Sequence, residues 1–208
     1  MENTEWSELS EDLQHRLLTE VKQMVEIDPC TFMMGALDND EEAYDHEKPR
    51  HAVTLTRKYS IGKYPVTQAL WENVMGNNPS QFNGSSRPVE HVSWLDCVLF
   101  CNKLSEMEGL EKAYLINGEN VQCNFDADGY RLPTSAEWEC AGRGGESHLY
   151  SGSNSPDEVA WYDKNSWALR SVGQKQCNGF GLFDMSGNVW EWCWDWFEDY
   201  SSAPTEDP

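Results

Sequence analysis

The sequence predicts a loop-rich α+β domain made of short elements. Short runs of strand-forming residues at 31–35 and 51–56 indicate β-strands. Three later segments begin with a Ser or Thr that can cap a short helix. From residue 142 to 202, Gly, Asn, Ser and Asp are frequent and predict mostly loop. Large aromatic side chains are interspersed there, and a loop-rich domain needs them to bury enough apolar area.

The N-terminal residues 7–26 have the spacing of an amphipathic helix. Apolar residues recur there at steps of three and four, with charged residues between them. We therefore predict a helical leader over residues 1–28 and one domain over 29–208. Between the first two strands, residues 38–47 form an acidic segment without the glycine and closing glutamate of an EF-hand. We expect a solvated loop there, and extended chain over 59–65.

The three predicted helices each have a local start and stop signal. The first covers residues 68–75, the second follows a Ser-x-x-Asp motif, and the third follows a Thr-x-x-Glu motif. The last two motifs are capping boxes, in which the side chains satisfy amide donors of the first helical turn. Glycines suited to a helix C-terminus follow. The predicted N-caps are Thr67, Ser93 and Thr134, and the predicted terminating glycines are Gly76, Gly109 and Gly142.

Charge restricts the partners of this chain. Its 208 residues include 15 Lys and Arg against 36 Asp and Glu, a net charge of −21. Such a chain repels nucleic-acid phosphates and anionic membrane surfaces, and it favours cations and basic partners. No segment has the basic and apolar regions of a secretory signal or the length of a membrane span, so we expect a cytoplasmic protein.

The seven cysteines form no Cys-x-x-Cys motif, so the sequence lacks the signature of zinc ribbons and thioredoxin-like enzymes. Without a secretory signal we expect mostly reduced thiols. Cys97 and Cys101 lie one helical turn apart and share a face, which favours core packing over a soft-metal site. Motifs for nucleotide binding, serine hydrolysis and zinc proteolysis are also absent.

The segment 179–192, GFGLFDMSGNVWEW, has the densest chemical pattern. Asp184 and Glu191 are hard oxygen ligands, and the glycines between them allow backbone carbonyls to turn toward a cation, as calcium sites require. The competing interpretation is a tight turn packed by Trp190 and Trp192, which we expect to be core residues.

At these blocks the sequence resembles the formylglycine-generating enzyme, or sulfatase-modifying factor, family. The similarity covers about residues 30–200, and the last two matching blocks are highly specific. The blocks are FMMG (32–35), EKPRH (47–51), YPVT (64–67), RPVEHVSW (87–94), YRLPTSAEWE (130–139) and NGFGLFDMSGNVWEW (178–192).

The resemblance implies a C-type-lectin-like fold of the formylglycine-generating type, which is α+β with short helices and a small antiparallel sheet. It also implies a calcium site formed by the Asp184 side chain, the Gly187 and Val189 carbonyls and the Glu191 side chain. The family includes copper-dependent oxidases that convert a protein cysteine to formylglycine. Their copper-binding cysteine pair lies C-terminal to the segment that matches here, so we expect no copper site in this chain.

Three possible functions follow from the resemblance and from the absence of the copper-binding cysteine pair. The first is a non-catalytic, calcium-stabilised module that binds a protein or small ligand, with exposed aromatics of residues 161–200 as contacts. The second is a copper-dependent oxidase or related maturation enzyme, if the C-terminal segment is supplied. The third is a truncated remnant without independent activity. The sequence favours the first, and it does not identify the ligand.

Overall fold

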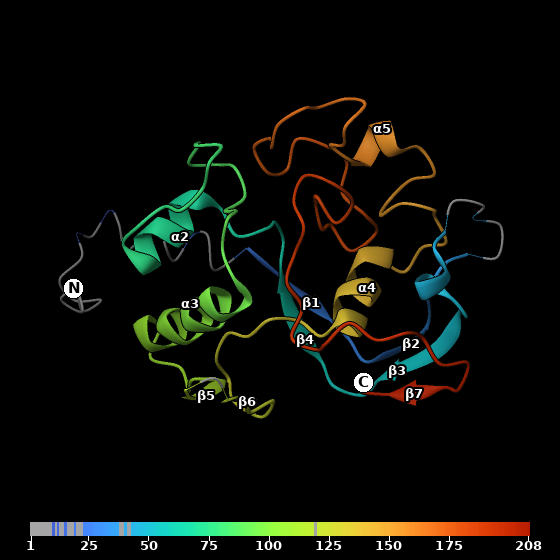
Figure 1. Ribbon diagram of the computed structural model, residues 1–208, viewed down its shortest axis with the longest axis horizontal. Helices are drawn as coiled ribbons and strands as arrows, with labels where there is room; N and C mark the ends of the chain where they lie inside the picture. The colour runs from blue at the N-terminus through green and yellow to red at the C-terminus, as the bar shows by residue number, and fades with distance from the viewer. Residues whose placement is uncertain are drawn as a thin grey trace. The chain divides into compact units, whose positions relative to one another are not determined.

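The computed structural model describes residues 10, 12, 15, 19, 23–37, 40, 43–118 and 120–208 (Figure 1). These residues divide into two compact units. One contains Val66–Leu132 together with the described residues before Met24. The other is assembled from two separate stretches of chain, Met24–Pro65 and Pro133–Pro208. The 66–132 segment is thus inserted, in sequence, between the two parts of the second unit.

The 66–132 unit consists of two helices and a hairpin. The helices pack through Trp71 and Phe100, whose rings stack with centroids 5.0 Å apart and planes 3° from parallel. Thr67 and Ser93 cap the two helices as predicted, and Gly76 ends the first in the left-handed conformation. The elements are α2 (Gln68–Met75), α3 (Trp94–Met107), β5 (Tyr114–Asn117) and β6 (Asn120–Cys123) (Figure 1).

The second unit contains two small sheets. In one, β1 (Met24–Ile27) pairs antiparallel with β4 (Tyr59–Gly62). In the other, β2 (Cys30–Met34) pairs antiparallel with β3 (His51–Leu55), and β7 (Thr205–Glu206) adds parallel to β3. Alternate residues of β3 are buried, as expected for a strand with one face on the core.

Helix α4 (Ser135–Arg143) packs against these strands. Thr134 caps it with the predicted capping box, and the helix continues through Gly142 to end at Gly144 rather than at the glycine we expected. Glu139 accepts a hydrogen bond from the Gly35 amide at 2.8 Å, which ties α4 to the end of β2. The core between them contains Ile27, Met34, Val53, Leu55, Ala136 and Cys140.

The remaining chain is mostly loop, as predicted. Between α4 and β7 the described residues contain one short helix, α5 (Pro156–Val159). The acidic segment 38–47 lies partly outside the described residues, and its last part, Asp45–Glu47, is a 3₁₀ helix, η2. No helix among the described residues has the length and apolar character needed to cross a membrane.

The predicted leader requires one correction. Most of residues 7–26 lie outside the described residues, although Asp12, His15 and Thr19 are helical. The end of the predicted helix is wrong, because Met24–Ile27 is the strand β1. Pairing with β4 and burial of Ile27 provide tertiary contacts that outweigh the local helical spacing. Residues 24–27 therefore belong to the second unit.

Candidate functional site

The predicted calcium loop is anchored to α4 by the buried side chain of Asn178. Its Nδ2 donates to the Ala141 carbonyl at 2.8 Å, and its Oδ1 accepts from the amides of Phe180 and Leu182 at 3.0 and 3.1 Å. Leu182 is fully buried and packs with Ala141. A polar side chain that satisfies several backbone groups in this way fixes a loop without regular secondary structure.

Asp184 lies at the centre of the loop. Its residue is 3% exposed and adopts a left-handed backbone conformation with φ 58°. Oδ2 accepts from the Gly173 amide at 2.7 Å, and Oδ1 accepts from Asn188 Nδ2 at 3.3 Å. Burial raises the pKa of Asp184, and these two hydrogen bonds partly oppose the increase. Each carboxylate oxygen retains capacity to accept a further interaction.

Gly187 occupies a position that requires glycine. Its φ is +80°, and a Cβ there would lie 2.3 Å from the Trp161 carbonyl oxygen. The neighbouring Asn188 amide donates to that same carbonyl at 2.8 Å, so the 187–188 backbone runs close against residue 161. The Gly187 carbonyl accepts from the Val189 amide at 2.8 Å, which forms a tight turn just before Glu191.

Glu191 lies beside α4 and near Asp184. Its Oε2 accepts a hydrogen bond from Trp138 Nε1 at 3.2 Å. The residue is solvent-accessible, yet surrounding protein atoms desolvate the carboxylate and raise its pKa to about 7. The Trp138 hydrogen bond lowers this pKa, and the negative charge of Asp184 raises it. The fold therefore brings together the two carboxylates that the sequence singled out.

This arrangement fits a hard cation in part. Neither carboxylate forms an ion pair with Lys, Arg or His in the part of the chain that the structure describes. A divalent cation would neutralise both, and the Gly187 and Val189 carbonyls lie in the same turn. The described residues contain no cluster of three or more His, Cys, Asp or Glu side chains that could hold a metal. Water would have to complete the coordination.

The aromatic residues after the loop correct our expectation of a packed core. Trp190 is 99% exposed and Trp192 is 50% exposed, so both are surface residues. Trp196 and Phe197 are 89% and 76% exposed. Phe197 packs edge-on against His46 of η2, with ring centroids 5.2 Å apart, but most of its surface and nearly all of Trp190 and Trp196 stay exposed. An aromatic pattern that normally indicates a core therefore forms a surface here. We call Trp190, Trp192, Trp196 and Phe197 the aromatic segment.

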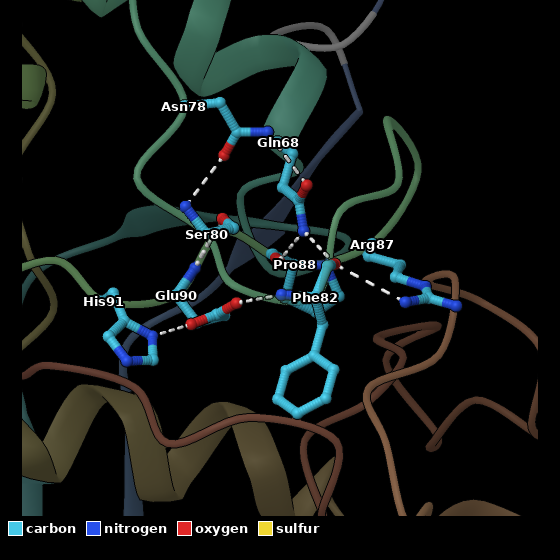
Figure 2. Close-up of polar contacts among 8 residues, drawn as sticks. All are labelled: Gln68, Asn78, Ser80, Phe82, Arg87, Pro88, Glu90 and His91. Carbon is cyan, nitrogen blue, oxygen red and sulfur yellow. Dashed lines mark hydrogen bonds and ion pairs between the residues drawn. The ribbon is translucent and has the colours of Figure 1, made fainter.

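A second polar cluster lies in the 66–132 unit, around the buried side chain of Gln68 (Figure 2). Its Nε2 donates to the carbonyls of Phe82 and Pro88 at 3.0 and 3.1 Å. Its Oε1 accepts from Asn78 Nδ2 and the Gly84 amide, both at 3.0 Å. All four hydrogen-bonding positions of the amide are used. The cluster therefore orders the loop between α2 and α3.

Glu90 and His91 continue this network (Figure 2), and the side chain of His91 is exposed. Glu90 Oε1 accepts from the Phe82 amide at 2.8 Å, and its Oε2 contacts His91 Nδ1. Burial acts to raise the pKa of Glu90, but hydrogen bonds from Phe82, His91 and Gln81 outweigh it and lower the pKa. The contacts are satisfied within the loop, which indicates a structural role for the 87–94 block.

A family model described as the sulfatase-modifying factor enzyme 1-like domain matches residues 9–206. The chain belongs to this family. The resemblance and the α+β fold of the formylglycine-generating type expected from the sequence are confirmed.

Relatives that are similar to this chain include a chaperone protein, an enzyme and a variable protein. The chaperone protein LppX of Paenibacillus barcinonensis is 42% identical, over 78% of this chain and 69% of that protein. The formylglycine-generating enzyme of Streptomyces coelicolor is 30% identical, over 69% of this chain and 44% of the enzyme. The chain thus spans less than half of that enzyme. The solved structure of Treponema denticola variable protein 1 has a TM-score of 0.80 and 37% identity, covering 88% of this chain and 76% of that one.

The sequence did not identify every residue that builds the site of this sulfatase-modifying-factor-like domain. Trp138, which donates to Glu191, was expected only as part of a capped helix. Asn188 also holds Arg170, accepting from its amide at 2.9 Å, and so fixes the geometry around Asp184. The residue type of Asn188 was a usable signal, because Asn adopts a positive φ more readily than most residues do. In the structure Asn188 has a φ of 61°. Trp138 offered no comparable signal.

Proposed function

We propose that this chain is a non-catalytic, calcium-stabilised binding module that engages a protein partner through the aromatic segment. The observation that carries the proposal is the near-complete exposure of Trp190 and Trp196. Monomeric surfaces rarely expose large aromatic side chains together, and such side chains anchor protein interfaces. One relative is named a chaperone protein, and a chaperone acts by binding other proteins, which supports this class of partner.

Calcium has a structural role in the proposal. The cation would bind Asp184 and Glu191 with the carbonyls of Gly187 and Val189, at the start of the aromatic segment. By neutralising two desolvated carboxylates it would stabilise the turn from which Trp190 projects. Supporting observations are the raised pKa values of both carboxyl groups and the absence of a basic partner for either among the described residues.

The charge of the chain indicates the chemistry of the partner. Two exposed acidic residues, Glu198 and Asp199, directly follow the aromatic segment, and the chain carries a net charge of −21. Aromatic faces and carboxylates together attract Lys and Arg side chains by cation–π and ionic interactions. We therefore propose a partner surface that presents basic residues. A small ligand is the other candidate that the sequence left open.

The calcium part is tested by thermal unfolding with calcium and with a chelator. A ligand that binds only the folded state at about one hundred times its Kd adds about 2.7 kcal/mol, a Tm increase of about 5–10 °C. The increase should disappear in Asp184→Ala and Glu191→Ala. Glu198→Ala is the matched control, because this exposed acid lies in the same segment but outside the loop. Equal shifts in all variants would contradict the assignment.

The partner part is tested by titrating the protein with basic peptides while following tryptophan fluorescence. A Lys- and Arg-containing peptide series should shift the emission and bind, and the same peptides with Glu in place of Lys and Arg should not. Trp190→Ala and Trp196→Ala should weaken binding by about tenfold or more each. Trp167→Ala is the control, since Trp167 is 88% exposed but lies outside the segment. Binding that all three variants retain would refute the surface.

Copper-dependent oxidation of a protein cysteine is the alternative function. It is favoured by the similarity to formylglycine-generating enzymes, which match this chain over less than half of their length. Tight Cu(I) binding and oxidation of a cysteine-containing peptide by this chain would support it over the binding module.

A further inference from the structure

Two cysteines distant in sequence meet in the core of the second unit. Cys30 is the first residue of β2, and Cys140 lies in α4, 110 positions later. Their Sγ atoms are 2.9 Å apart. Cys140 belongs to the buried cluster, and Cys30 is a half-buried residue packed against it.

The surroundings of this pair keep it in place. The Tyr59 hydroxyl donates to the Glu137 carbonyl at 2.7 Å and lies against the Cys140 thiol. The end of β2 is bound to α4 through Glu139 and Arg143, since Arg143 Nη2 donates to the Gly35 carbonyl at 2.5 Å. Helix α4 is therefore tied to β4 through Tyr59 and to the residue after β2 through Glu139 and Arg143. The thiols meet because the elements pack, and bonding them requires little movement.

The position of the pair in the chain gives a bond a specific consequence. Cys30 lies in the 24–65 stretch of the second unit and Cys140 in its 133–208 stretch. These stretches are joined along the chain only through the inserted 66–132 segment. A bond between them would close a loop that contains the whole insertion. Long loops are those whose closure removes the most entropy from the unfolded chain.

We propose that Cys30 and Cys140 are an oxidative modification site, where a low-molecular-weight disulfide converts the thiol pair to a disulfide that staples the two stretches of the second unit. This inference is independent of the proposed binding function. The sequence predicted mostly reduced thiols. Under this proposal Cys30 and Cys140 are reduced at first and become a disulfide when the oxidant is present.

The reaction proceeds by two exchange steps. The more accessible Cys30 loses its proton and attacks one sulfur of the small disulfide, which releases one small thiolate and leaves a mixed disulfide on Cys30. Cys140 then loses its proton and attacks the Cys30 sulfur, breaking the mixed bond and releasing the second thiolate. The two released thiolates take up the two protons. The protein dithiol is oxidised by two electrons, and the small disulfide is reduced to two thiols.

The buried partner sets the pH dependence of the second step. Burial, followed by the contact with Cys30, raises the pKa of Cys140 to about 12. Tyr59 and Glu139 are the other groups that face it, and the Tyr59 contact lowers this pKa while Glu139 raises it. Only the thiolate attacks, so the mixed disulfide should persist near neutral pH and resolve faster as pH rises.

The experiment uses the full, reduced chain incubated with oxidised glutathione and then alkylated and digested without reductant. We expect a cross-linked peptide pair joining Cys30 to Cys140, the loss of two hydrogen atoms from the intact mass, and a Tm increase of about 5–10 °C. Cys30→Ser should abolish the cross-link and the Tm increase. Cys177→Ser, which removes an exposed thiol, should preserve both.

If a variant fails to fold, the peptide map of the oxidised wild-type protein is sufficient to test the proposed disulfide. Alkylation of both Cys30 and Cys140 after incubation at alkaline pH, with no joined peptide, would overturn the proposal. A cross-link that joins either cysteine to a different partner, or one that forms only in urea, would overturn it equally. A mixed disulfide on Cys30 that converts to the cross-link as pH rises would confirm the order of the two steps.

Discussion

Ionisation of Glu191 should make the calcium-free protein less stable as pH rises. Its pKa in the folded protein is raised to about 7, from an ordinary value of 4.5. Between these values the folded state holds a proton that the unfolded state has released. Stability therefore falls as pH increases through this window, and the favourable contribution is fully present only below about pH 4.5. Asp184, whose pKa is also raised, acts in the same direction.

The magnitude follows from the size of the shift. A change from 4.5 to about 7 corresponds to at most about 3.4 kcal/mol, at about 1.4 kcal/mol per pKa unit. Glu191 is solvent-accessible, and water screens such interactions, so the ceiling needs to be reduced. We expect a loss of about 1–2 kcal/mol between about pH 5 and pH 8, a Tm decrease of about 3–6 °C.

The assay is urea unfolding in chelator at several pH values, compared between wild type and Glu191→Gln. The Gln variant should lose this part of the pH dependence, whereas Glu198→Gln, a control at an exposed acid, should keep it. The comparison cancels the general effect of a net charge of −21. At the proposed site calcium would bind the ionised carboxylates, and its addition should therefore abolish the decrease. The reasoning would be refuted if the stability of the wild-type protein were constant across this pH range. It would also be refuted if that stability rose with pH more steeply than the stability of Glu191→Gln.

Three further predictions concern the fold, each measured by urea unfolding. Gly187→Ala should lower the free energy of unfolding by about 3 kcal/mol, because the new Cβ would meet the Trp161 carbonyl. Gly76→Ala, also at φ +80° but with open space around it, should lower it by about 1 kcal/mol. Equal losses would show that the close approach is unimportant. Gln68→Leu should cost about 3 kcal/mol, since it removes four hydrogen bonds, one buried and three part-buried; a neutral effect would contradict the network. Thr134→Ala should cost about 1 kcal/mol through loss of the cap, and Thr134→Ser should restore most of it.

The helices could be predicted because their signals are local. A capping hydroxyl needs only the three residues that follow it, so Thr67, Ser93 and Thr134 marked their helices correctly. Termination was less certain. Gly142 has a permissible helical conformation, and the helix continues until Gly144, which adopts φ 58°. The choice between two nearby glycines depends on tertiary contacts such as Asn178 with the last turn.

Strands were harder to predict because their partners are distant. β1 has helical spacing, and only its pairing with β4 makes it a strand. The β5–β6 hairpin was missed, although Asn117 and Gly118 form a turn signal, because its strands are only four residues long. β7 pairs in parallel with β3 across most of the chain, and no local pattern contains that information.

At the candidate site, too, local sequence identified the carboxylates, whereas their surroundings depend on residues distant in the chain. Asp184 and Glu191 could be identified from residue type and the family motif, and the fold brings their carboxylates together. The environment that gives them their chemistry comes from elsewhere in the chain, through Gly173 and Trp138. The exposure of Trp190 could not be inferred either, because a tryptophan in a motif-rich loop is equally compatible with a core.

The carboxylates and the aromatic segment are linked by their order in the chain. Glu191 lies between Trp190 and Trp192, so a contact that fixes its carboxylate also restricts the backbone on which both rings stand. In the absence of a cation, the Trp138 hydrogen bond holds Glu191, and protonation relieves the repulsion from Asp184. Calcium at the proposed site would instead fix the ionised form. Calcium affinity and partner affinity should therefore be coupled, since ordering the segment before binding lowers the entropic cost of the complex. A basic peptide that binds equally well with calcium and with chelator would show that the turn and the surface act independently.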